Sequence, residues 1–156
     1  MPYLSLDTTD TPTENQQRDC TSALTDQYTE IMETDPDHVA VAIRTHPSEA
    51  MTLGRAVDGP IAVLSADIRR GRPFEQRRAF GLAVIDWLSA EWEISRPNLK
   101  IVFTEHSGDQ LMGADRVGSE WSPQSVTSRR STSTTPRAAP INEKHARTTN
   151  MTETDA

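Results

Sequence analysis

The first third of this 156-residue chain recurs 60 residues further on, and the match needs no gap. Identical residues at this shift are Leu4 and Leu64, Ser5 and Ser65, Asp7 and Asp67, Gln16 and Gln76, Arg18 and Arg78, Ala23 and Ala83, Asp26 and Asp86, and His46 and His106. The apolar pattern matches too, because Cys20, Leu24, Val41 and Ile43 fall on Phe80, Val84, Ile101 and Phe103. A match that preserves apolar positions indicates one structural unit that was duplicated and fused.

The first copy has the pattern of a strand, a helix and a second strand. Residues 2–7 predict a short strand that ends in turn-forming residues. Thr11, Pro12 and Glu14 predict a helix start with an N-cap, a proline at the first helical position and a capping-box carboxylate. Val39 to Arg44 is a β-branched run of strand length.

The second copy predicts a strand at about 61–67, a helix at about 73–92 and a strand at 99–105. Strands joined by a crossover helix pair in parallel, and two such units side by side give one sheet with both helices on the same face. The predicted fold class is therefore an α+β two-layer sandwich with a four-stranded mixed sheet. The alternation of Val39, Val41 and Ile43 with Ala40 and Ala42 predicts that both sheet faces are largely apolar, so the second face should be buried against other subunits. The segments Pro47 to Gly54 and Ser107 to Gly118 are candidates for small hairpins or edge strands at such an interface.

The predicted domain covers residues 1–121, with one unit at 2–60 and the other at 61–121. Residues 122–156 are rich in Ser, Thr, Pro and charge, and they are expected to be a disordered tail. Because this tail contains several arginines, the net charge of −7 belongs to the folded part and argues against a nucleic-acid surface.

Composition also bears on the compartment. The lone Cys20 has no disulfide partner, and no stretch of the chain predicts a signal peptide or a membrane span. We therefore expect a cytoplasmic protein with no membrane partner.

Pro2 is the first candidate for chemistry. Removal of Met1 would expose a secondary amine at the start of a core strand. An α-amino group has a pKa near about 8, and burial beside cations lowers that pKa towards neutrality, where the amine is a general base. The alternative is a Met-Pro start with no catalytic meaning.

The second candidate is the cluster of Arg69, Arg70 and Arg72, at the end of the third strand and the start of the second helix. Guanidinium groups beside helix N-terminal N–H groups suit a carboxylate. The first copy has Thr8 to Pro12 at this place and no arginine, which fits a functional difference between the halves. The alternative is a solvated basic turn.

Other polar residues favour structural roles. Asp37 fits a turn, and Tyr28 lies on the apolar face of the first helix. His46 and His106 occupy equivalent repeat positions, His38 and His145 are isolated, and no pair has zinc-ligand spacing, so we expect neither a metal nor a cofactor.

Taken together, these residues resemble the tautomerase superfamily over about residues 2–121. The resemblance rests on Pro2, on the fused repeat, on IRRGRPFEQRR from Ile68 to Arg78 and on KIVFTEH from Lys100 to His106. Gly71, Arg72, Glu75 and Gln76 resemble a stretch of the 4-oxalocrotonate tautomerases. The fused length and the IR-x-GR spacing are closer to the cis-3-chloroacrylic acid dehalogenase group.

The resemblance implies that Pro2 is the catalytic base or acid, that Arg69 and Arg72 hold a small carboxylate substrate, and that the chain forms a homotrimer. Tyr28 falls where the dehalogenases have a helix histidine, and Phe103 falls where they have a tyrosine. Their water-activating glutamate falls near Gly113 and Ala114, which cannot activate water, and Asp115 takes that place only with an alignment shift.

Malonate semialdehyde decarboxylases resemble the chain at Asp37 and at the pair Arg70 and Arg72, so the two arginines that bind substrate stay undecided. The expected function is a cofactor-independent tautomerase that isomerises a 2-hydroxy-dienoate or enol acid with Pro2 as general base. One alternative is a dehalogenase, hydratase or decarboxylase acting on a three-carbon acid. Another is a non-catalytic binding or assembly module.

Overall fold

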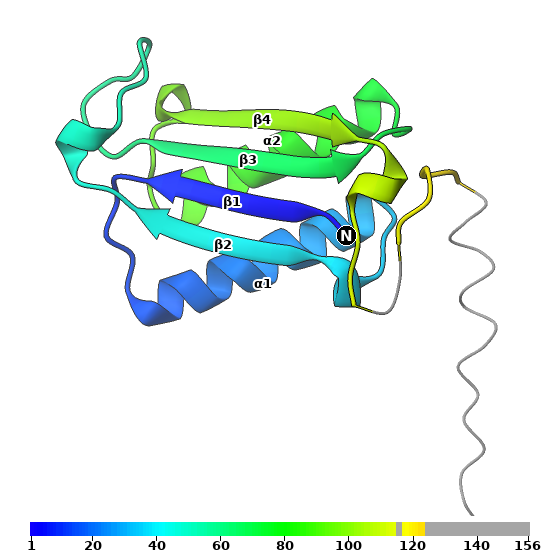
Figure 1. Cartoon of the computed structure of the whole chain (residues 1–156). Coiled ribbons are helices and arrows are strands. Elements are labelled where there is room, and N and C mark those ends of the chain that lie inside the picture. Colours follow the sequence, from blue (N-terminus) through cyan, green and yellow to red (C-terminus); the bar gives the residue numbers. More distant parts are fainter. Residues whose placement is uncertain (115–116, 124–156) are drawn as a thin grey trace, which may run out of the picture.

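A strand, a helix and a strand occur twice in the computed structural model, which describes residues 1–114 and 117–123. The elements are β1 (Tyr3–Thr8), α1 (Glu14–Ile31), β2 (Ala40–Thr45), β3 (Ala62–Arg69), α2 (Phe74–Glu91) and β4 (Leu99–His106). They form one four-stranded sheet with both helices against the same face (Figure 1). The predicted fold class is thereby confirmed.

The sheet has the order β2-β1-β3-β4, and it is mixed. Within each unit the two strands are parallel, whereas the central pair β1 and β3 is antiparallel. Ser5 lies opposite its own repeat counterpart Ser65 in the central pair. The two units are therefore related by a local twofold axis that passes between these two serines.

The shift of 60 residues recurs in structural detail. The bounds of α1 and α2 obey it, and so do two pairs of short 3-10 helices: η1 (Pro36–His38) with η3 (Arg96–Asn98), and η2 (Ser48–Ala50) with η4 (Gly108–Gln110). Left-handed backbone also repeats, because Glu33 and Glu93 have φ angles of 49° and 53°. A duplicated unit explains both copies of each feature.

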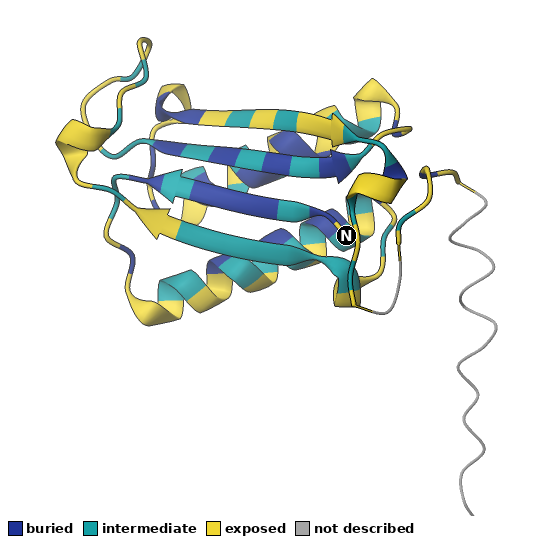
Figure 2. Cartoon of the chain, in the orientation of Figure 1, coloured by how far each residue is buried: buried dark blue, intermediate teal, exposed yellow. Residues whose placement is uncertain are grey.

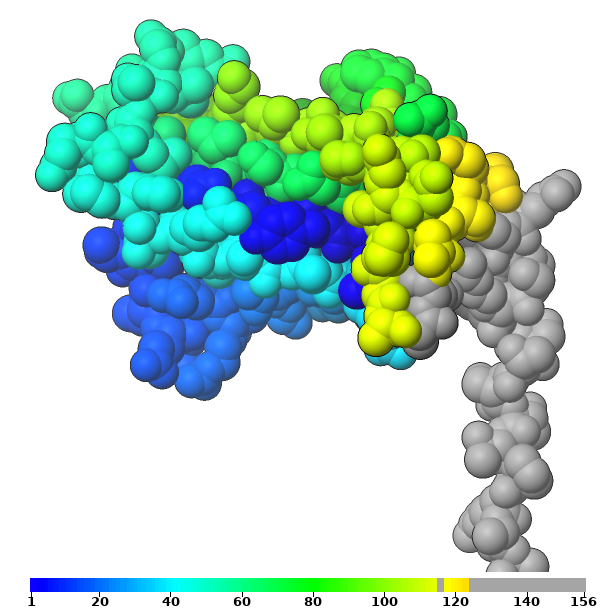
Figure 3. Space-filling model, viewed as in Figure 1, coloured from blue at the N-terminus to red at the C-terminus, as the bar shows by residue number. Residues whose placement is uncertain are grey.

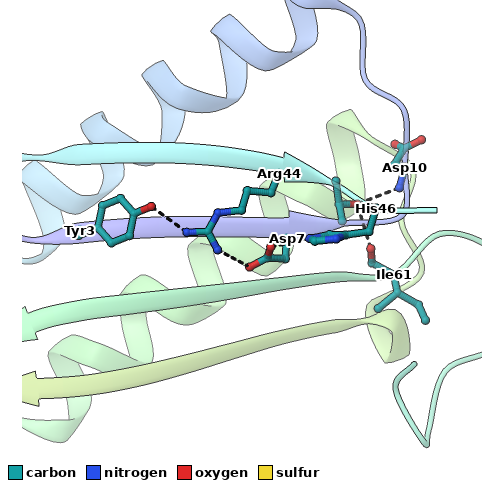
Figure 4. A network of polar contacts seen from close by, with 7 residues as sticks. Tyr3, Asp7, Asp10, Arg44, His46 and Ile61 are labelled. Carbon is teal, nitrogen blue, oxygen red and sulfur yellow. Dashed lines mark hydrogen bonds and ion pairs between the residues drawn. The ribbon is translucent and has the colours of Figure 1, made fainter. Parts of the chain in front are cut away.

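Two histidine–aspartate pairs show the same relation. The imidazole of His46 contacts the carboxylate of Asp7 at 2.7 Å, and His106 contacts Asp67 at 2.8 Å. Figure 4 shows the first pair within a network in which Arg44 also contacts Asp7 and donates a hydrogen bond to the Tyr3 hydroxyl group. These pairs give the two equivalent histidines the structural role that the repeat predicted.

The core lies between the sheet and the helices. Along β3, buried and half-buried residues alternate, and the buried set faces α1 and α2 (Figure 2). Tyr28 of α1 packs edge-on against Phe80 of α2, with ring centroids 5.2 Å apart. The face of the sheet away from the helices carries small and polar side chains on β1 and β2, such as Ser5 and Ala42, rather than the largely apolar face predicted.

Two local predictions were wrong. Helix α1 is capped by Thr13, whose side chain exchanges hydrogen bonds with Gln16, so the helix starts two residues after the predicted position. The segments 47–54 and 107–118 contain no strand in their described part. Each begins with a 3-10 turn that bonds its backbone locally, and the sole ladder contact described there is a bridge between Met112 and Val117.

Residues 124–156 of the predicted tail lie outside the described residues, as does Asp115. Within residues 1–114 and 117–123, no helix has both the length and the apolar character needed to cross a bilayer.

Candidate active site

A small pocket lies at the end of the sheet where β1 begins and β3 ends, with a volume of about 50 Å³. Pro2, His38 and Arg69 line it from the ends of three neighbouring strands, and Tyr28 and Arg72 line it from the helix side. The chain that follows β4, coloured yellow in Figure 3, lies across this end of the sheet and contributes residues 117–119. Met1 also lines the pocket, so its removal would enlarge the space.

Sheet pairing fixes Pro2 in place. The Ala40 N–H group donates to the Pro2 carbonyl oxygen at 3.1 Å, and the Pro2 side chain is buried. Because β1 is a central strand, its first residue lies between the start of β2 and the end of β3. A base at this position is flanked on both sides by functional groups of neighbouring strands.

The three arginines of the cluster have different environments. Arg69 is half-buried, lines the pocket and donates a hydrogen bond to the Ser119 carbonyl oxygen at 2.9 Å. Arg72 also lines the pocket, but only 4% of its surface is exposed. Arg70 is exposed and does not line the pocket; its backbone N–H group bonds the His106 carbonyl oxygen.

Arg72 is held by the surrounding structure. Its Nε donates to the Met32 carbonyl oxygen at 2.8 Å, and its guanidinium lies over the rings of Tyr28 and Trp121 at 5.6 and 5.1 Å from their centroids. Burial lowers the pKa of Arg72 from its ordinary value, but a guanidinium stays protonated at neutral pH. Arg72 therefore brings a fixed positive charge to the wall of the pocket.

Tyr28 is 1% exposed, and burial raises the pKa of its hydroxyl to about 12 although Arg72 and Arg69 act in the opposite direction. Desolvation outweighs these cations because it disfavours the phenolate more than they stabilise it. At neutral pH the hydroxyl group is protonated and is able to donate a hydrogen bond within the pocket.

The opposite end of the sheet is closed. His38 and Tyr28 have Asn98 and Leu88 as repeat counterparts, and Pro2 has Ala62. Asn98 is fully buried, accepts a hydrogen bond from the Val57 N–H group at 2.7 Å and donates to the carbonyl oxygens of Val57 and Pro60 at 2.9 and 3.0 Å. The same architecture thus carries a pocket at one end and a sealed loop at the other.

No protein-family model and no curated protein sequence matches this chain. Solved structures do match it. N1, a member of the cis-3-chloroacrylic acid dehalogenase family, is 16% identical with a TM-score of 0.69, and the match covers 76% of this chain and 84% of that one. A fused 4-OT symmetric trimer is 18% identical with a TM-score of 0.65, over 75% of this chain and 94% of that one. A malonate semialdehyde decarboxylase is 18% identical with a TM-score of 0.63, over 73% and 92%.

The chain has the tautomerase superfamily fold.

Within this tautomerase-like fold, the structure brings together some of the residues singled out in the sequence. Pro2, Tyr28, Arg69 and Arg72 line one pocket. Asp37 is exposed on η1 and does not line it. Phe103 packs against the core beside Phe80, at a centroid distance of 6.3 Å, and does not line it either.

Sequence reasoning missed His38 and Thr34, which also line the pocket. His38 had seemed isolated because, unlike His46 and His106, it has no histidine at the equivalent repeat position and no partner at zinc-ligand spacing. The predicted parallel pairing of the first two strands held the signal, because it places the residues just before both strands, Pro2 and His38, at the same end of the sheet. In the described part of the chain, no group of three or more His, Cys, Asp and Glu side chains is placed to bind a metal ion.

Proposed function

We propose that this protein is a cofactor-independent tautomerase that moves a proton within a small enol acid, with the amino-terminal amine of Pro2 as general base. The observation that carries this proposal is that Pro2, Arg69, Arg72 and Tyr28 line one pocket. It combines a potential base, positive charge for a carboxylate and a hydrogen-bond donor for an oxyanion. These are the groups that a keto-enol isomerisation requires.

Met1 has to be removed first, because Pro2 bonded to Met1 is an amide and not a base. In the processed chain, the guanidinium groups of Arg69 and Arg72 would lower the pKa of the Pro2 amine by disfavouring its protonated form. Burial of Pro2 acts in the same direction. The amine is then neutral and basic near physiological pH.

In the proposed reaction, neutral Pro2 takes the proton of the 2-hydroxyl group of a 2-hydroxy-dienoate or similar enol acid. The electron pair of the O–H bond forms the carbonyl group, and the double-bond electrons move to a chain carbon. The Pro2 ammonium returns the proton to that carbon, so the enzyme ends unchanged. Arg69 holds the carboxylate, and the Tyr28 hydroxyl group donates to the oxygen on which negative charge develops.

We also infer that the protein works as a cytoplasmic homotrimer. A symmetric trimer is named for the fused 4-OT structure of the same fold. One face of the sheet lacks helices, and second and third subunits would cover it (Figure 1). Analytical ultracentrifugation tests this assembly, and a monomer at micromolar concentration would contradict it.

The experiment that tests the function follows ketonisation of phenylenolpyruvate and 2-hydroxymuconate by ultraviolet absorbance. Mass spectrometry first establishes that Met1 has been removed. Pro2→Ala replaces the secondary amine by a less basic and less rigidly placed primary amine, so kcat is expected to fall, by at most the about 10²- to 10⁴-fold that a positioned general base contributes. Pro47→Ala is the matched control, since Pro47 is an exposed proline before η2 and should leave the rate unchanged.

If the processed wild-type chain turns over neither compound, the tautomerase proposal fails. If Pro2→Ala keeps the wild-type rate, the secondary amine of proline is not what the reaction requires, and that part of the proposal fails.

A further inference from the structure

His38 and Arg69 lie on opposite sides of Pro2. Tyr3 pairs with Ala40 on one side and with Asp67 on the other, so Pro2 is flanked by the residue after His38 and by the residue before Arg69. Neighbouring strands are about 4.8 Å apart, which puts the backbones of His38 and Arg69 roughly 10 Å apart. Both side chains line the pocket, so a ligand held by Arg69 extends across Pro2 towards His38.

Asn98, the repeat counterpart of His38, shows what a polar side chain does at this position. It forms three hydrogen bonds with backbone groups of Val57 and Pro60, whose own counterparts are Val117 and Glu120. In the first unit, the corresponding space is the pocket, and residues 117–119 line it. The position therefore directs its side chain into the space at the strand end, where Asn98 meets loop backbone in the second half and His38 lines the pocket in the first.

The backbone of His38 is held rigidly. Its N–H group donates to the Asp35 carbonyl oxygen at 3.1 Å, and the next N–H group, of Val39, donates to the Pro36 carbonyl oxygen at 3.0 Å. The Asp35 carboxylate caps the same turn by accepting from the Asp37 N–H group. A side chain on such a fixed turn binds a ligand without a large ordering cost.

We propose that His38 is a specificity-determining residue that binds an oxygen-bearing group at the end of the substrate opposite the carboxylate held by Arg69. The site thereby selects acids with polar groups at both ends, such as dicarboxylates, over acids whose far end is apolar. This inference rests on the proposed use of the Pro2 pocket, and it concerns recognition rather than the proton-transfer step.

The test compares two unreactive ligands that share a six-carbon dienoate chain. Muconate has a second carboxylate at its far end, and sorbate has a methyl group there. Titrations of the full Met1-processed chain, followed by NMR, give both dissociation constants. Since a hydrogen bond to a charged group changes affinity by about 10- to 100-fold, the wild-type chain should bind muconate at least tenfold more tightly than sorbate.

Three variants assign the preference. His38→Phe keeps a planar ring but no hydrogen-bonding atom, and it should lose the preference by weakening muconate alone. His38→Asn introduces the side chain found at position 98 and should restore part of it. His46→Asn, in the pair with Asp7 that does not line the pocket, is the control and should keep it.

Equal binding of the two ligands by the wild-type chain would overturn the inference. So would a preference that survives in His38→Phe, or an equal loss of both ligands in that variant, which would indicate a structural role. A preference that depends on His38 in a chain that ketonises neither enol acid would support recognition by His38 and refute the tautomerase reaction.

Discussion

Arg72 is expected to contribute mainly to the stability of the fold rather than to substrate binding, and Arg72→Met tests this. The side chain is 4% exposed. Its Nε donates to the Met32 carbonyl oxygen at 2.8 Å, and its Nη1 donates to the Arg69 carbonyl oxygen at 3.4 Å. The rings of Tyr28 and Trp121 flank the guanidinium. Methionine keeps an unbranched stem of similar length but removes the charge and every donor.

The expected cost follows from these contacts. The shorter hydrogen bond from a charged donor contributes about 1.5–3 kcal/mol, and the longer one adds little. The two cation–π contacts contribute roughly 0.5–1 kcal/mol each. Methionine regains part of this sum because it no longer buries a charge. We expect a net loss of about 3 kcal/mol, and with a urea m value of about 2 kcal/mol/M the unfolding midpoint should fall by about 1.5 M.

Urea unfolding of three variants measures this and separates the roles of the arginines. Arg70→Met should leave the midpoint unchanged, because Arg70 is exposed. Arg69→Met should lower the midpoint little and weaken muconate binding by about 10- to 100-fold. The reasoning is refuted if Arg72→Met unfolds at the wild-type urea concentration and nevertheless loses muconate binding, since Arg72 would then act on the ligand directly.

Other residues give equally specific expectations. Asn98→Ala leaves three backbone groups of the sealed loop without their partner, and urea unfolding should show a loss of about 2–4 kcal/mol. Gly108→Ala places a methyl group into the backbone of Ser119, so it should displace the segment over the pocket and weaken muconate binding in the same titration. Burial raises the pKa of the Tyr28 hydroxyl group from 10 to about 12. Below pH 10 the hydroxyl group is protonated in both the folded and the unfolded chain, whereas between pH 10 and 12 only the unfolded chain ionises, so the free energy of unfolding falls over that range. Over that range the wild-type chain should lose about 3 kcal/mol more stability than Tyr28→Phe does, as measured by urea unfolding at each pH.

Much of the fold was readable in the sequence because the repeat preserved spacing. Both helices and their following 3-10 turns obey the 60-residue shift that Leu4 and Leu64 first indicated. Local ambiguity caused the error at α1, where Thr11 and Thr13 both begin a plausible capping pattern. Only the hydrogen bonds of the folded chain distinguish them, and these favour Thr13.

The site was less predictable because it depends on which strands are neighbours. Pro2 and Arg69 were identified from their chemistry alone, but His38 joins them only because β2 lies beside β1 in the sheet. Phe103 shows the converse. It falls where the dehalogenases have a tyrosine, whereas its side chain packs against the core beside Phe80. A linear pattern identifies residue types, and the sheet order determines which of them meet.

The pocket draws on both repeats, since Pro2 and His38 come from the first and Arg69 and Arg72 from the second. This has an evolutionary consequence. A symmetric dimer of first-half chains would place Thr9 and Pro12 where the arginines now lie, and a dimer of second-half chains would have Ala62 in place of Pro2. Neither symmetric dimer would rebuild the site, because it needs one copy of each half, and the covalent fusion supplies the two diverged halves in equal number.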